Sequence, residues 1–165
     1  MNEPNTAAFP DAIKPVLAVL EQSQAEYTVK TYASPAKSAG QAAELIGCPL
    51  GAIVKSLFFA LQETDDYLLV LTSGANRVSG ERLEAYLKQR AKPASPAVVL
   101  EKTGFPVGGV PPFGHKTAFP VVMDIDLMQY DRVWASAGAI HAVMGMTPQD
   151  ILDLSHAELY DVKEV

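Results

Sequence analysis

One stretch of this 165-residue chain combines residue types that favour a binding loop over regular structure. Residues 103–116 read T-G-F-P-V-G-G-V-P-P-F-G-H-K, with glycines that allow positive φ or close approach to a ligand and prolines that fix φ. The stretch has no acid, serine or cysteine. Any chemistry must therefore come from backbone N–H groups, from His115 and Lys116, or from shape. We predict a functional loop, the alternative being a passive connector of turns.

A phosphate-binding P-loop is excluded by the spacing of this stretch. The pattern G-x-x-x-x-G-K-[ST] is broken because His115 precedes Lys116 in G-V-P-P-F-G-H-K-T. Pro111 and Pro112 also remove two amides that such a phosphate cradle would use. A nucleoside-triphosphatase is not expected.

A lysine stands in an otherwise apolar strand pattern, I-V-K-S-L-F-F-A-L, at Lys55. Burying an ammonium group costs several kcal/mol unless an anion or a polar cleft receives it. Lys55 is therefore predicted to point into a site, the alternative being a place at the end of a sheet.

A run of small residues, A-S-A-G-A, occupies positions 135–139 and is followed by Ile140 and His141. We predict a turn between two strands, which could be a plain hairpin or could admit a ligand and present amides to an oxyanion. His141 is the best side-chain candidate for an accessory base. The alternative is a strand histidine satisfied by a neighbour.

Metal chemistry and the common nucleophile motifs have no support in the sequence. The three histidines have no H-x-x-x-H spacing, Cys48 has no C-x-x-C partner, and no G-x-S-x-G occurs. We therefore expect no metal and no cofactor, and activity that survives chelation. Cys48 is interpreted as a small core residue.

The composition favours a cytoplasmic protein. A single cysteine cannot form an internal disulfide, no apolar run has the roughly 18 residues of a membrane span, and the first ten residues lack a signal-peptide pattern. The net charge is −6, yet residues 77–116 hold seven Lys or Arg against three Glu. This basic segment is either a solvated helix face or a patch that contacts phosphates.

The elements that must position these groups can be predicted from periodicity and capping residues. Helices are expected over residues 11–24, from Ser38 to Gly47, after Ser79, from Ser95 to Gly104, and from Thr147 through 152. Strands are expected over 27–32, 53–61, 67–72, 121–125, 132–135, 139–144 and 158–162, with the second and third forming an antiparallel hairpin.

Six or seven strands interleaved with short helices predict an α+β fold with a mixed, curved, barrel-like sheet. Length and hydrophobic content indicate a single domain over residues 1–165. Residues 1–9 and the last few are expected to fray.

Taken together, these pieces resemble the YbaK / prolyl-tRNA synthetase insertion-domain family of editing deacylases, which hydrolyse mischarged aminoacyl-tRNA. The resemblance rests on I-V-K-S-L-F-F, on the glycine and proline loop, and on W-A-S-A-G-A-I-H-A-V-M-G-M-T-P-Q-D-I-L, in the family's order and spacing. The segment A-A-E-L-I-G-C-P-L-G-A-I, which leads into the lysine strand, also matches. The similarity therefore covers nearly the whole chain.

The resemblance implies site residues, a substrate and partners. Catalytic roles would fall to Lys55, Gly108, Gly109, Ser136 and Gly138, and substrate binding to Pro112, Phe113 and Gly114. The side chains of His115, Lys116 and His141 are added as substrate-binding candidates from the residue types themselves. Members that act on cysteinyl-tRNA carry G-K-R-G-L-D after the small-residue run, where this chain has G-A-I-H-A-V. Alanine or another small amino acid on prolyl tRNA is therefore the expected substrate. The tRNA acceptor end and a prolyl-tRNA synthetase are the expected partners.

Two functions remain open at this stage. The first is a trans-editing deacylase, in which an already activated ester needs positioning, oxyanion stabilisation and an oriented water or a ribose hydroxyl. The second is a non-catalytic module that binds a tRNA end, a nucleotide or a synthetase. Retention of Lys55 together with the glycine loop favours the first.

Overall fold

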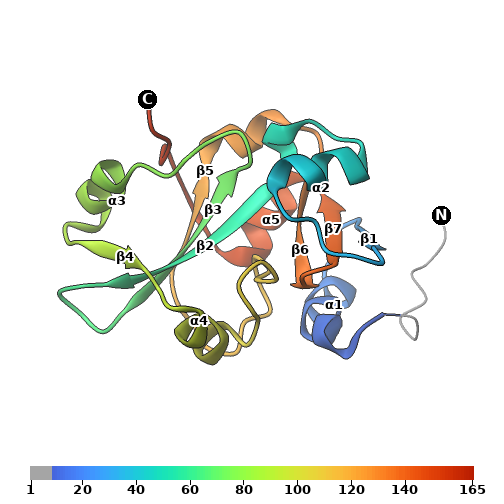
Figure 1. Ribbon diagram of the computed structural model, residues 1–165, viewed down its shortest axis with the longest axis horizontal. Helices are drawn as coiled ribbons and strands as arrows, with labels where there is room; N and C mark the ends of the chain where they lie inside the picture. Colours follow the sequence, from blue (N-terminus) through green and yellow to red (C-terminus); the bar gives the residue numbers. More distant parts are fainter. Residues whose placement is uncertain (1–8) are drawn as a thin grey trace.

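The computed structural model describes residues 9–165 and has an α+β architecture, as predicted (Figure 1). Its strands form a five-stranded and a three-stranded sheet, with short helices around them. The sheets do not close into a barrel. Where one curved sheet was expected, the structure has two sheets that meet at an angle. The predicted fraying of residues 1–9 lies, except for Phe9, outside the described residues.

The larger sheet has the strand order β4-β2-β3-β5-β8. Strands β2 and β3 form the predicted antiparallel hairpin, β4 pairs with β2 antiparallel, and β5 and β8 add on in parallel. The bounds are Val54–Leu61 for β2, Tyr67–Ser73 for β3, Ala91–Pro93 for β4, Val121–Asp124 for β5 and Glu158–Tyr160 for β8. Strand β4 was not predicted, because three residues ending in proline carry no strand pattern of their own and exist as an edge strand through pairing with β2.

The smaller sheet is antiparallel and has the order β1-β7-β6. Its strands are β1 (Thr28–Thr31), β6 (Val133–Ala139) and β7 (Ala142–Met146). A parallel bridge between Ile53 and Trp134 joins it to the larger sheet beside β2. The two sheets therefore meet where β2 and β6 begin.

The small-residue run is not the turn that the sequence suggested. Strand β6 continues through Ala139 with a register shift between Ser136 and Ala139, and Ile140 and His141 form the turn to β7. Gly138 has a φ of 112°, and its N–H donates to Ser136 Oγ over 3.2 Å. Small residues here therefore build a β-bulge, in which one strand absorbs extra residues without ending.

The five α-helices of the described chain begin at predicted caps or close to them. They are α1 (Lys14–Gln22), α2 (Ala39–Ile46), α3 (Gly80–Leu87), α4 (Pro96–Thr103) and α5 (Pro148–Ser155). The hydroxyls of Ser38, Ser79, Ser95 and Thr147 each accept the backbone N–H three residues on. Gly47 and Gly104 end α2 and α4 in the left-handed conformation, as expected.

The chain's C-terminal segment is attached to the fold. Val78 and Lys163 form an antiparallel bridge, and the N–H of Glu164 donates to the carbonyl of Arg77 over 2.8 Å. The expectation that the last few residues fray is therefore wrong for this segment.

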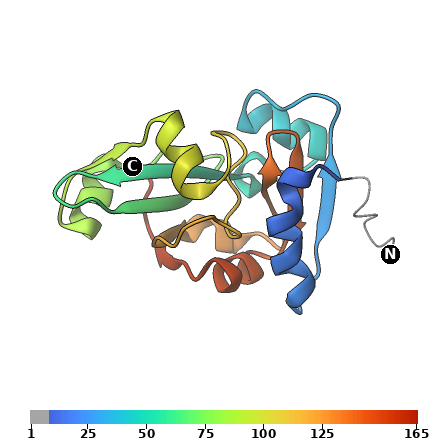
Figure 2. The same cartoon turned by 90° about the horizontal axis from the view of Figure 1, so that it is seen from below.

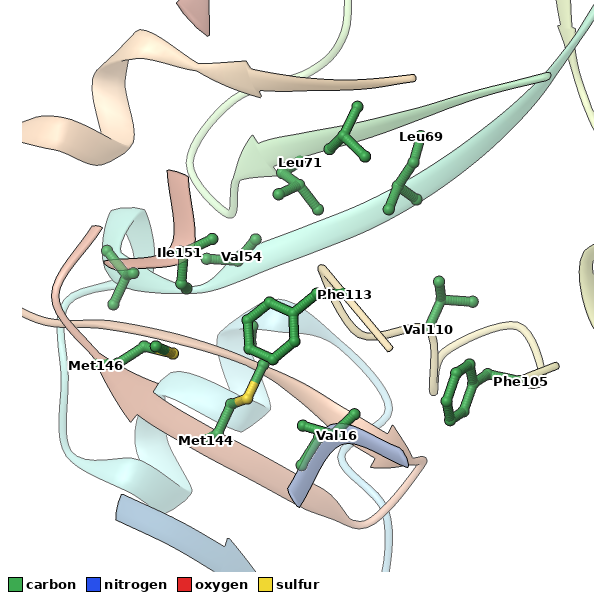
Figure 3. Close-up of a cluster of buried hydrophobic side chains, with 14 of the residues drawn as sticks. Val16, Val54, Leu69, Leu71, Phe105, Val110, Phe113, Met144, Met146 and Ile151 are labelled. Atoms are coloured by element: carbon green, nitrogen blue, oxygen red, sulfur yellow. The ribbon is translucent and has the colours of Figure 1, made fainter. Parts of the chain in front are cut away.

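The main core lies between the two sheets and α1, as Figure 3 shows in part. Helix α1 lies beside the smaller sheet and buries Val16, Leu17 and Leu20 (Figure 2). Phe113 points into this core, which also contains Met144. Each such side chain contributes about 1.5–3 kcal/mol by burial, so the core fixes the relative placement of the sheets and of the loop that carries Phe113.

Candidate active site

A cleft of about 340 Å³ lies where the two sheets meet. Its walls come from the start of β2, the bulged end of β6, the start of β7, the N-terminal part of α2 and the first half of the glycine and proline loop. The lining includes Lys55, Ser56, Val107, Gly108, Val110, Trp134, Ser136, Ala139, Ile140 and Ser38. Most of these groups are apolar, with a few polar ones, which is typical of a site for a small ligand.

Lys55 lines this cleft, half-buried on β2. Its Nζ donates to the backbone carbonyl of Asn76 over 2.6 Å, and no other acceptor among residues 9–165 contacts it. Burial lowers the pKa of Lys55, helped by the nearby Arg77 cation and opposed by the carboxylate of Asp124. Two N–H directions therefore remain for a ligand.

Gly108 forms the tip of a turn at the edge of the cleft. The N–H of Gly109 donates to the carbonyl of Pro106 over 2.9 Å, and Gly108 has a φ of 85°. This is the pattern of a type II turn, in which glycine is favoured at the third position. Within the part of the chain that the structure describes, the N–H of Gly108 has no hydrogen-bond partner, so it can donate to a ligand.

Gly109 has a different reason to be glycine. A Cβ here would lie 3.2 Å from the N of Ile140 and 3.3 Å from the carbonyl carbon of Ala139. Gly109 is buried, and its N–H already closes the turn with Pro106. It thus seats the loop on the β6–β7 hairpin and has no amide free for a ligand.

Ser136 lines the cleft, whereas Gly138 faces away from it. The Ser136 hydroxyl holds the bulge by accepting the N–H of Gly138. A Cβ on Gly138 would meet the ring of Phe105 at 2.8 Å and the carbonyl oxygen of Ala12 at 3.1 Å. Gly138 is therefore required by packing against the core side of β6.

His141 and the second half of the loop lie outside the cleft. His141 borders a separate hollow with Tyr32 and Phe9. Residues 112–116, which are Pro112, Phe113, Gly114, His115 and Lys116, border another hollow together with the end of α5. The structure thus brings together Lys55, Gly108 and Ser136 and separates them from the other predicted site residues.

His115 serves the fold of the loop. Its Nε2 lies 2.6 Å from the carbonyl oxygen of Pro111, and its ring packs against Phe119 at 4.7 Å between centroids. Burial lowers the pKa of His115, while the bond to Pro111 acts in the opposite direction. The contact between His115 and Pro111 stabilises the fold of residues 111–115, and His115 does not line the cleft.

Sequence reasoning missed a polar network behind Lys55. Asp124, fully buried at the end of β5, accepts hydrogen bonds from Thr72, the N–H of Ser73 and the side chain of Asn76. The signal was present, since Asp124 is a lone charge in the apolar run V-V-M-D-I just as Lys55 is in its own strand. The same rule, applied to acids as well as lysines, would have found it.

The described residues place no cluster of three or more His, Cys, Asp or Glu side chains at metal-binding distance. None of the helices over residues 9–165 has the length and apolarity required to cross a bilayer.

Comparison with known proteins identifies the family and the fold. The family model of the aminoacyl-tRNA editing domain matches residues 33–154, which include every segment of the cleft wall. The chain belongs to this family. Its members are deacylases that hydrolyse mischarged aminoacyl-tRNA, so the family predicted from the sequence is confirmed.

Similar proteins agree with this placement. A crystal structure of a candidate trans-editing enzyme for prolyl tRNA synthetase superposes with a TM-score of 0.89 at 34% identity, covering 96% of this chain and all of that one. The YwhH protein of Bacillus subtilis (strain 168) is 29% identical over 90% of this chain and 94% of its own length. The multifunctional Ser/Thr-tRNA deacylase ProXp-y of Escherichia coli (strain K12) is 26% identical over 90% of both chains. Each of these three alignments covers at least 90% of this chain and of the similar protein.

Proposed function

We propose that the cleft hydrolyses the ester that links a small amino acid to the 3′ end of tRNA, with prolyl tRNA charged with alanine as the leading substrate. The observation that carries the proposal is that Lys55 and Gly108, whose N–H has no partner among the described residues, line the same cleft. An ammonium group and a backbone amide on residues that line one small cleft are suited to an ester with a phosphate nearby.

In this proposal Lys55 attracts the phosphate or ribose oxygens of the terminal nucleotide, and the N–H of Gly108 donates to the ester carbonyl. Water, oriented by a ribose hydroxyl of the substrate, adds to the carbonyl carbon. The tetrahedral intermediate then expels the ribose oxygen, which takes a proton. Because an aminoacyl ester is already activated, these positioning effects suffice without a protein nucleophile.

The lining also supports a small, weakly polar amino acid. Val110, Ala135, Ala139 and Ala142 are apolar groups of the cleft wall, whereas Ser136 supplies a hydroxyl that is already engaged in the bulge. Apolar walls gain little from a substrate hydroxyl, so alanine is preferred over serine by hydrophobic complementarity. The similarity to ProXp-y makes serine and threonine the main competitors.

Substitution of Lys55 by alanine tests the site. We expect Lys55→Ala to reduce single-turnover deacylation by at least about 100-fold while the protein stays folded by circular dichroism, because a half-buried charge–phosphate contact exceeds a surface ion pair. Lys92→Ala is the matched control, since Lys92 is an exposed lysine of β4 in the same sheet. Near-wild-type turnover by Lys55→Ala would remove Lys55 from the mechanism.

A substrate panel tests the specificity and the non-catalytic alternative together. Prolyl tRNA would be charged in turn with alanine, serine, threonine, cysteine and proline, and the rate of ester loss measured. We expect alanine to be released fastest and proline to be retained. Tight binding of charged tRNA without release of any amino acid would establish the non-catalytic module instead.

A further inference from the structure

The carbonyl that holds Lys55 belongs to a short connection after β3. Asn76 offers its backbone oxygen to Lys55 Nζ at 2.6 Å, and its own N–H donates to the carbonyl of Ser73 over 2.9 Å. A backbone acceptor is only as well placed as the segment that carries it. The position of the Lys55 ammonium in the cleft therefore depends on what fixes residues 73–76.

Two carboxylates fix this connection through the Asn76 side chain. Asn76 Nδ2 donates to Asp124 Oδ2 over 2.9 Å and to Asp126 Oδ2 over 2.8 Å. Asp124 Oδ2 also accepts from Thr72 Oγ1 and from the N–H of Ser73, while its Oδ1 accepts the N–H of Asp126. One buried carboxylate thus ties β3, the connection and the start of the 3₁₀ helix Ile125–Gln129 together.

The C-terminal segment closes the outer side of the network. Lys163 Nζ lies 2.9 Å from Asp126 Oδ2, on the same oxygen that accepts Asn76. These hydrogen bonds and this charge pair lower the pKa of Asp126, so Asp126 stays ionised. The contacts run from Lys163 to Asp126, from Asp126 to Asn76, and from Asn76 to Lys55 in the cleft. The fully buried Asp124 also contacts Asn76.

We propose that Asp124, acting through Asn76, is a positioning residue for Lys55 that sets the direction and depth of its ammonium group in the cleft. This inference rests on the proposed function, because it assigns a role in the same reaction. Asp124 does not touch the substrate. Charged hydrogen bonds in a buried network are strong and directional. A change at Asp124 is therefore expected to shift the Asn76 carbonyl, and with it the ammonium group of Lys55, without breaking the hydrogen bond between them.

The network also acts on the charge of the lysine. The charged groups that influence Lys55 are Arg77, which lowers its pKa, and Asp124, which raises it against the effect of burial. Removal of the Asp124 charge should therefore lower the pKa of Lys55. Asn76→Ala keeps the Asp124 charge, so a fall in kcat of that variant separates positioning through Asn76 from the direct effect of the charge on Lys55.

The test combines kinetics with nuclear magnetic resonance of ¹³C-methylated lysines, the Lys55 signal being assigned by its loss in Lys55→Arg. We expect Asp124→Asn to lower the pKa of Lys55, because the carboxylate that opposes the effect of burial is removed. We expect kcat to fall about tenfold, with KM changed less than about threefold. Asp11→Asn is the control, because Asp11 is an exposed carboxylate paired with Lys14 near the N-terminus.

Asn76→Ala provides a second variant in case the buried Asp124→Asn fails to fold. It keeps the backbone carbonyl that accepts from Lys55 and removes only the hydrogen bonds of the side-chain amide to Asp124 and Asp126. We expect it to lower kcat about tenfold as well, and Lys163→Gln, at the outer end, to lower kcat less than about threefold. Wild-type kcat in folded Asn76→Ala would overturn the proposal, as would an unchanged Lys55 pKa in folded Asp124→Asn. Failure of the proposed function is separate, because it shows as full activity of Lys55→Ala.

Discussion

The two halves of the glycine and proline loop have similar compositions and different roles. Residues 106–110 form a turn at the cleft with an unpaired amide, whereas residues 111–116 bury Phe113 and bond His115 to Pro111. Gly108 and Gly114 both have positive φ. Composition therefore identifies a shaped loop, but contacts with the rest of the fold decide which half meets a ligand and which half anchors it.

The largest expected effect is on the anchoring half. Phe113→Ala should lower the free energy of unfolding by about 3–5 kcal/mol, because a large ring is removed from the centre of the core. Urea denaturation measures this change. Deacylation by the folded fraction, measured at low temperature, should remain within a few-fold of wild type. A large rate loss in that fraction would show that the two halves are not separable.

The next effect compares two glycines, Gly108 and Gly114, that have nearly the same positive φ. Alanine at Gly108 disfavours positive φ, so the Val107–Gly108 peptide is expected to flip and turn its N–H away. Single-turnover deacylation should fall about 10²–10³-fold. A new Cβ would be 3.8 Å from Ile140, so steric cost is small.

Gly114→Ala is the matched control for that measurement. Its φ is 83°, and a Cβ would lie 3.3 Å from the backbone of Pro15. We expect lost stability, measured by urea denaturation, with a rate within a few-fold of wild type. Equal rate losses in both variants would erase the distinction between the halves.

A smaller effect concerns pH. Because burial lowers the pKa of His115, the unfolded chain binds a proton more readily than the folded one, and stability falls as pH decreases through about 6.5 and below. His115→Gln should reduce the loss of urea midpoint between about pH 7 and 5. An unchanged slope would mean that His115 does not titrate with unfolding.

The smallest effect is expected for Lys116, an exposed cation of the anchoring half. Lys116→Ala should change the deacylation rate by no more than a few-fold, in contrast to Lys55→Ala, because the side chain does not line the cleft. A loss comparable with that of Lys55→Ala would place tRNA on the hollow bordered by residues 112–116 and the end of α5, and would extend the site to this half of the loop.

The sequence by itself determined the local features and the family. Ser38, Ser79 and Ser95 begin helices as predicted, because a capping hydroxyl acts within three residues of its own position. Lys55 was identified because a charge in an apolar strand demands a polar environment wherever the strand lies. Such signals need no knowledge of distant parts of the chain.

Only the tertiary structure decided which predicted groups meet. The bulge in β6 turns Gly138 toward the core and leaves His141 on another surface, and β4 exists only through pairing with β2. Asp124 lies next to Asn76 because β5 adds to β3 in parallel, 48 residues farther along the chain. Contacts of this kind depend on strand pairing and bulges, which are set by the packing of both sheets at once and leave no periodic pattern in the residues involved.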